Sequence, residues 1–231
     1  MTMETPKVAS RAATGGAFES GRTAKPATLD HLVYATPRLD HTVDEFTELT
    51  GVRPAEGGSH VGLGTRNFLV SLGGRRYLEL IGPDPDQPAP VRPRPFDIDA
   101  LTGASVITWA ISPSDFDGTV ARARERGYDP GEVHPMSRRT PAGDLLSWRL
   151  TLAEDRQLPG LVPFLIDWGT ATHPTAAGLP ETPLLDLTVR SPRPAQTEAP
   201  LSALGIDLPV EQGPRGISFT VDTPRGPVSF S

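Results

Sequence analysis

Two residues far apart in the chain, His31 and Glu79, carry side chains that bind metal ions or move protons. His31 lies in LDHLVYAT (29–36) and Glu79 in RYLELIG (76–82), and both stretches are predicted strands. A carboxylate within an apolar strand needs a partner, because burying it unpaired is costly. An imidazole beside a carboxylate is a ligand pair for Zn, Fe, Mn, Co or Ni, or an ordinary buried hydrogen-bonded pair.

His60 and Asn67 follow each other closely in GGSHVGLGTRNFLVSLG (57–73). If HVGLGT is a regular strand, His60 shares a face with Gly62 and Gly64, whose bare backbone admits a ligand or marks a bulge. His60 is then a candidate general base or further metal ligand, with a surface position as the alternative. Asn67 is a candidate to bind a substrate oxygen, or it caps the turn from Gly64.

Three arginines form a second candidate group. Arg138 and Arg139 lie in MSRRTPAG (136–143), and Arg149 alternates with Trp148 in SWRLT (147–151). An inward arginine binds a carboxylate or ketone oxygen bidentately, whereas an outward one forms a surface salt bridge. Arg139 and Arg149 are therefore predicted to bind substrate.

Three tryptophans of the predicted strands are candidates for lining a small-molecule pocket or filling the core: Trp109, Trp148 and Trp168. Alignment of Pro113 with Pro37 gives Trp109 the position that corresponds to Val33, which lies on the face of His31. Trp109 is therefore predicted to contact substrate.

These residues lie on elements whose order repeats: strand, helix, strand, strand, strand. Val43, Phe46 and Leu49 recur at helical spacing before Gly51, and a second helix is expected to begin at Ser114. The order recurs with a period of about 75 residues. Because one helix covers only one face of a sheet, units of this kind must pair. The predicted units are 28–85, 104–170 and 183–231, with a Pro-rich surface link at 83–103.

Composition excludes several classes of function. The chain has 231 residues, a formal net charge of −6 and no cysteine, which excludes thiolate zinc sites and cysteine nucleophiles and argues against nucleic-acid binding. No apolar run approaches the length of a membrane span, and residues 1–27 read as a disordered tail. A soluble, cytoplasmic protein without a nucleic-acid or membrane partner is expected.

The sequence resembles the glyoxalase-like domain family of the vicinal oxygen chelate superfamily over about 28–231. The resemblance is carried by LDHLVYATP, GGSHVGLGTRNFLVSLG, YLELIGPDP, TWAIS and PFLIDWGTATHP in this order, and by the pairing of His31 with Glu79. It implies an α+β fold of repeated βαβββ modules that form a cupped, mixed β-sheet. In the superfamily, paired modules surround a divalent metal that chelates two substrate oxygens. Members include lyases, isomerases, dioxygenases and metal-free antibiotic-binding proteins.

The remaining metal ligands are less clear in this chain. The second unit offers Ile107 at the position of His31, and the third offers Asp186 there. The predicted metal ligands are therefore His31, Glu79 and Asp186, with Asp167 or His173 as an addition.

Two functions follow from the predicted ligands. The first is a divalent-metal-dependent lyase, isomerase or dioxygenase in which Glu79 binds the metal or moves a proton. The second is a metal-free protein that binds or sequesters a small molecule. Pairing of two chains into a homodimer is left open.

Overall fold

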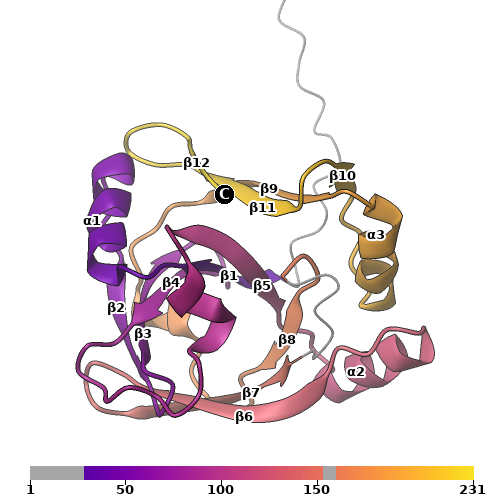
Figure 1. Ribbon diagram of the computed structural model, residues 1–231, viewed down its shortest axis with the longest axis horizontal. Helices are drawn as coiled ribbons and strands as arrows, with labels where there is room; N and C mark the ends of the chain where they lie inside the picture. Colours follow the sequence, from indigo (N-terminus) through magenta and orange to yellow (C-terminus); the bar gives the residue numbers. More distant parts are fainter. Residues whose placement is uncertain (1–28, 153–159) are drawn as a thin grey trace, which may run out of the picture.

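Eight strands from two successive units close into a barrel in a computed structural model, which describes residues 29–152 and 160–231 (Figure 1). The first unit comprises β1 (Leu29–Ala35), α1 (Leu39–Thr50), β2 (Ala55–His60), β3 (Thr65–Ser71) and β4 (Tyr77–Pro83). The second comprises β5 (Ser105–Ile111), α2 (Phe116–Glu125), β6 (Glu132–Arg139), β7 (Leu145–Leu152) and β8 (Phe164–Asp167), followed by the short 3₁₀ helix η3 (Pro174–Ala177). The predicted βαβββ order is therefore present in both units.

The two units share one interior because they join along two seams. In each unit the first strand pairs in parallel with the last, β1 with β4 and β5 with β8. Antiparallel pairing of β1 with β5 and of β2 with β6 then closes the barrel. Alternate side chains of every strand point inward, so residues of both units meet inside.

The third unit forms a separate sheet and adds no strand to the barrel. It comprises β9 (Leu184–Ser191), α3 (Pro194–Ala203), β10 (Val210–Gln212), β11 (Gly216–Val221) and β12 (Val228–Phe230). Here the first strand, β9, pairs with β10 and β11 rather than with the last strand. The sheet lies over β1 and β5 (Figure 1), and Val189 and Phe219 join one apolar cluster with Leu32 and Trp109.

The helices begin and end where local chemistry dictates. In α1, Leu39, Val43 and Phe46 are buried, and Gly51 adopts a left-handed conformation and bonds the carbonyl of Thr47, as the sequence predicts. The N-cap of α2 is Asp115 rather than Ser114, because its carboxylate accepts a hydrogen bond from the Gly118 N–H.

The Pro-rich link is more than a surface loop. It contains the 3₁₀ helix η2 (Pro95–Ala100), whose Ile98 is fully buried against Val33, Ala35 and Ile81. These three residues share the inward face of β1 and β4 with His31 and Glu79. The link therefore fills part of the barrel interior beside the candidate site.

No helix in the described part of the chain has the length and apolar character needed to span a membrane. The predicted tail, residues 1–27, lies outside the described residues.

Candidate functional site

Glu79 lies at the centre of a buried polar cluster inside the barrel. Its Oε1 accepts a 2.6 Å hydrogen bond from Nδ2 of Asn67 and lies 3.6 Å from Nε2 of His60, while its Oε2 lies 3.9 Å from Nε2 of His31. All four residues are buried. The structure thus brings together four of the predicted site residues, which come from the four strands of the first unit.

Asp30 fixes the orientation of His31 from behind. Its carboxylate is 2.7 Å from Nδ1 of His31 and 3.2 Å from Nε2 of His173, and it accepts a 3.0 Å hydrogen bond from the indole N–H of Trp168. Burial raises the pKa of Asp30, but hydrogen bonds and charge from His173 and His31 outweigh this and hold that pKa well below its usual range. An ionised Asp30 keeps the proton of His31 on Nδ1 and directs Nε2 toward Glu79.

His60 ends β2 beside a tight turn. Its Nδ1 is 3.1 Å from the Thr65 hydroxyl. Burial lowers the pKa of His60, and of the neighbouring charges Glu79 raises that pKa while Arg138 lowers it. The neutral imidazole that results is able to accept a proton or bind a metal ion.

The turn after His60 corrects the expected strand HVGLGT. The strand β2 stops at His60, and Gly62 and Gly64 adopt left-handed conformations with φ of 74° and 63°. The two glycines therefore form the turn into β3 and do not extend the face that carries His60.

Aromatic and cationic side chains surround the cluster. The ring of Tyr77 stacks on His31 with a 4.7 Å centroid distance, and Phe164 meets the same imidazole edge-on at 5.5 Å. The ring centroids of Trp148 and His60 are 6.2 Å apart, and the buried Arg138 is the direct cross-strand neighbour of His60. Sequence reasoning assigned neither Asp30 nor Tyr77 to the site, and the polar Asp30 beside His31 in an apolar strand was the available signal.

Asn67 is held by a glycine across the sheet. A Cβ on Gly57 would lie 2.2 Å from Oδ1 of Asn67, so this amide occupies the space that a side chain would fill. Because Nδ2 bonds Glu79, Oδ1 is fixed on the other side, where it is buried without a hydrogen-bond partner in 29–152 and 160–231. The cluster therefore contains an unused acceptor.

Two predicted substrate residues point away from the barrel interior. Arg139 is exposed. Arg149 forms ion pairs with Asp117 and Asp167, and its guanidinium lies 4.6 Å from the ring centroid of Phe116. The surface salt-bridge alternative therefore holds for Arg149.

Trp109 and Asp186 also lie outside the cluster. Trp109 packs with Leu32 on the outer side of β5 and donates a hydrogen bond to the carbonyl of Leu161. Trp109 faces outward, opposite to the prediction, because the side chains of β5 do not alternate strictly. Ile107 and Ala110 both pack inside the barrel, so the alternation fails between them. Asp186 is exposed on β9 of the separate sheet and accepts a hydrogen bond from Thr188, so it cannot complete the predicted ligand set.

The second unit supplies apolar residues where the first supplies ligands. Ile107 and Ile166 pack inside the barrel, and Asp167 pairs with Arg149 at the rim. Within 29–152 and 160–231, no three His, Asp or Glu side chains are already arranged around one point as a metal site. The donor chemistry of His31, His60 and Glu79 nevertheless fits a divalent ion. The Nε2 atoms of His31 and His60 lie 3.9 and 3.6 Å from the two different oxygens of Glu79.

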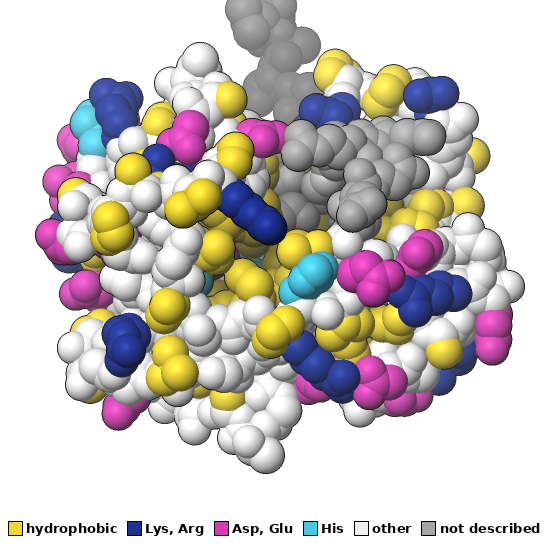
Figure 2. Space-filling model, turned by 60° about the horizontal axis from the view of Figure 1, so that its bottom comes forward, with side chains coloured by type: hydrophobic (Ala, Val, Ile, Leu, Met, Phe, Trp, Pro, Cys, Tyr) yellow, Lys and Arg dark blue, Asp and Glu magenta, His cyan; other side chains and the backbone are white. Residues whose placement is uncertain are grey.

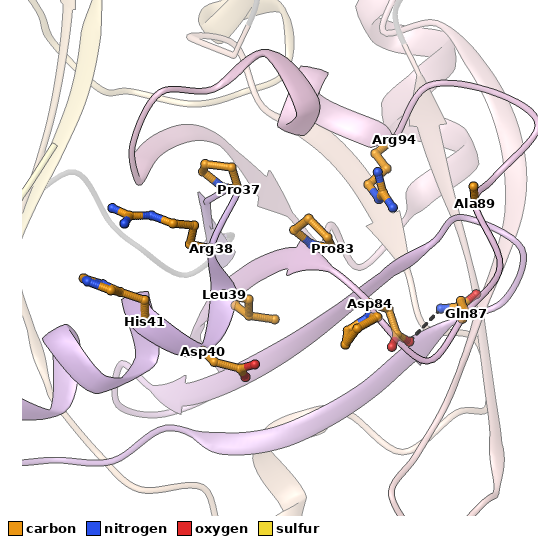
Figure 3. A pocket seen from close by; sticks show the side chains of 11 residues that line it. Pro37, Arg38, Leu39, Asp40, His41, Pro83, Asp84, Gln87, Ala89 and Arg94 are labelled. Atoms are coloured by element: carbon orange, nitrogen blue, oxygen red, sulfur yellow. Dashed lines mark hydrogen bonds between the residues drawn. The ribbon is translucent and has the colours of Figure 1, made fainter.

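A hollow of about 510 Å³ lies outside the barrel where α1 begins and β4 ends (Figure 3). Asp84 and Gln87 bond each other there, and Arg38 and His41 point away from them. The lining Asp40 and Arg94 are already paired, with Arg66 and Asp99. Because Asp40 and Arg94 are already paired, this hollow offers less chemistry than the buried cluster around Glu79. On another face, hydrophobic side chains gather in a central depression (Figure 2).

Comparison with known proteins supports the architecture. A model of the glyoxalase-like domain family matches residues 29–205. A crystal structure of a hypothetical protein from Staphylococcus aureus is similar with a TM-score of 0.60 and 17% identity, over 87% of this chain and 84% of that one. No curated protein matches.

Methylmalonyl-CoA epimerases resemble the chain less closely. The Streptomyces coelicolor enzyme gives a TM-score of 0.42 with 24% identity, over 60% of this chain and 95% of that one. The Mycobacterium tuberculosis enzyme gives 0.36 with 20% identity, over 57% and 83%. Similarity at this level carries no argument about activity.

Proposed function

We propose that this chain, which belongs to the glyoxalase-like domain family of the vicinal oxygen chelate superfamily, binds a small molecule inside its barrel and transforms it with Glu79. The observation that supports this proposal is the pair of imidazoles that flank the buried carboxylate of Glu79, at 3.9 and 3.6 Å. Nitrogen and oxygen atoms that are buried this close together are costly unless a proton or a cation lies between them. A metal ion or an acidic group of a substrate would relieve that cost.

His31, His60 and Glu79 would hold a divalent metal ion at this place. Such an ion, when bound, polarises a substrate oxygen as a Lewis acid. His60 takes the place in the ligand set that the sequence assigned to Asp186.

The residues around Glu79 prepare it to move a proton. Asn67 holds Oε1 and thereby sets the direction of the carboxylate. Asp30 keeps the ring of His31 in place, and Ile98 and Phe164 exclude water from the neighbouring interior. This arrangement suits proton transfer at a carbon next to a polarised oxygen, the step shared by isomerases and lyases.

Metal content tests the proposal. Protein purified without a histidine tag is expected to carry a stoichiometric amount of a divalent metal. Inductively coupled plasma mass spectrometry measures this metal content. His31→Ala and Glu79→Ala are expected to lose it, whereas Asp186→Ala and His41→Ala retain it, because Asp186 and His41 are exposed outside the barrel. Absence of metal from the wild-type chain after loading with Zn, Fe, Mn, Co or Ni would exclude the metal-dependent reaction.

A metal-free binding protein is the second candidate. It is favoured by the second unit, which presents Ile107 and Ile166 in place of ligands. In that case any small molecule that the barrel binds is expected to bind equally well in the presence and absence of a metal chelator. If the chain binds such a molecule and does not convert it to a product, the chain is a binding protein and not an enzyme.

A further inference from the structure

Arg138 is a buried arginine that faces the barrel interior. It is only 5% exposed and lies on β6 two residues after Met136, which packs in the interior cluster. Its cross-strand neighbour is His60. Burial lowers the pKa of Arg138, while the neighbouring Tyr77 and Glu79 raise that pKa.

The guanidinium has no carboxylate partner among the residues that the structure describes. Within the described part of the chain, no Asp or Glu lies at ion-pair distance from Arg138, and its hydrogen-bond partner is the backbone carbonyl of Gly57. The nearest interior carboxylate, Glu79, is instead bonded to Asn67 and flanked by two imidazoles. A guanidinium remains charged in a protein and carries five donors, so most of its donor capacity is left for another group.

An apolar wall continues from the charged group. Met136, Leu146, Trp148 and Phe164 are partly buried and pack around the interior cluster of Leu150 and Ile166. The ring centroid of Trp148 lies 6.2 Å from that of His60. A buried cation beside an accessible apolar and aromatic wall matches a molecule with an anionic head and an apolar body.

From this arrangement we infer that the ligand of the barrel is a small organic acid, whose carboxylate binds Arg138 and whose apolar or aromatic body lies against Trp148 and Met136. A planar carboxylate matches the two parallel N–H groups of a guanidinium. The position next to the carboxylate carbon then faces Glu79 and His60. This inference rests on the proposed function in one respect, that the barrel interior is the binding site.

Matched pairs of probes test the charge directly. Phenylacetate, phenylpyruvate and phenyllactate are each compared with the corresponding neutral amide by isothermal titration calorimetry on the full chain. At least one acid is expected to bind the wild-type protein about tenfold or more tightly than its amide, since a charged hydrogen-bonded pair is replaced by a neutral one. Equal binding of acids and amides, or binding of no acid in the series, would overturn the inference.

Substitutions assign the effect to one residue. Arg138→Met removes the charge while keeping an unbranched apolar side chain, and it is expected to abolish the preference for the acid. Arg138→Lys keeps the charge without the bidentate geometry and retains part of the preference. Arg139→Met is the control, because Arg139 is the exposed neighbour on the same strand. An unchanged preference in a folded Arg138→Met protein would show that another group binds the carboxylate.

The two proposals fail in distinguishable ways. If acids bind through Arg138 but the chain takes up no metal and turns over no acid, the ligand class stands and the catalytic role of Glu79 is wrong. If metal is retained through His31 and Glu79 but no acid binds, the metal centre stands and the ligand class is wrong.

Discussion

Asp30 accepts a hydrogen bond from His31 at 2.7 Å although the two residues are adjacent on one strand. Neighbouring side chains of a regular strand point to opposite faces. In β1, however, the register with β5 shifts between Leu29 and His31, so Asp30 is the extra residue of a bulge. The bulge allows a buried carboxylate to support the imidazole from within the same strand.

Asp30→Asn is expected to destabilise the protein and loosen the site. The amide cannot accept equally from His31, His173 and Trp168, so the free energy of unfolding should fall by about 1–3 kcal/mol. Any metal affinity should fall by about 10- to 100-fold, because the imidazole loses its support. Urea denaturation and metal titration measure the two effects.

The matched control for this substitution is Asp44→Asn. Asp44 forms an exposed ion pair with Arg53, and its loss should change stability by less than about 1 kcal/mol. Equal stability of the Asp30 and Asp44 variants would contradict the supporting role of Asp30.

The folded protein should lose stability as the pH falls below 6.5, in part through His60. Burial lowers the pKa of His60 below the ordinary histidine value of 6.5. Between the folded pKa and 6.5 the unfolded chain binds more protons than the folded chain, so the free energy of unfolding decreases on acidification. In metal-free protein, His60→Gln should flatten this part of the pH profile, measured by urea denaturation at a series of pH values.

The exposed His41 provides the control for the pH profile. His41→Gln should leave the slope as in the wild type, since its side chain is about half exposed on α1 and pairs only with Glu45. A profile that is identical in the wild type and His60→Gln would show that His60 is not buried in its neutral form.

A second loss of stability is expected near and below pH 3.8. In that range the unfolded chain binds a proton at Asp30, whereas the folded chain keeps this carboxylate ionised because its pKa is lowered.

Local patterns were sufficient to predict most elements of the barrel, although β2 was expected further along the chain, at HVGLGT (60–65). Helical spacing and Gly51 located α1, and Gly73 and Gly74, both with positive φ, form the predicted turn between β3 and β4. Alternation along β1 and β4 placed His31 and Glu79 on one face, and the structure brings them to 3.9 Å. These features depend on a few neighbouring residues.

Long-range pairing decided what the sequence left open. Arg138 and Arg139 are adjacent, and only the register of β2 with β6 determines that Arg138 faces inward. The irregularity in β5 that turns Trp109 outward leaves no mark on the alternation of the sequence. Asp186 was placed by aligning its strand with the first, but β9 pairs with different partners and builds another sheet.

Gly57→Ala is expected to disturb the site through Asn67. The added Cβ would meet Oδ1 of Asn67 at 2.2 Å and Leu69 at 3.0 Å, so the amide must leave its place beside Glu79. Overpacking of this kind costs about 1–3 kcal/mol of unfolding free energy. Gly103→Ala is the control, because no atom lies within 4 Å of its added Cβ. Denaturation curves of the two variants that coincide would refute the close packing of Asn67 on Gly57.

Ile98→Ala is expected to open the filled end of the barrel. Ile98 is fully buried against Val33, Ala35 and Ile81, and it is carried by the Pro-rich link rather than by a strand. Truncation of a buried isoleucine costs about 2–5 kcal/mol, depending on how far the cavity collapses. The same truncation at Val91, which is fully exposed in the same link, should change stability by less than about 0.5 kcal/mol. Because the cavity lies on the inward face shared with Glu79, hydrogen exchange of the β1 and β4 amides should also accelerate in Ile98→Ala and not in Val91→Ala. If both variants match the wild type, the link is only a surface loop and the interior beside Glu79 is closed by other residues.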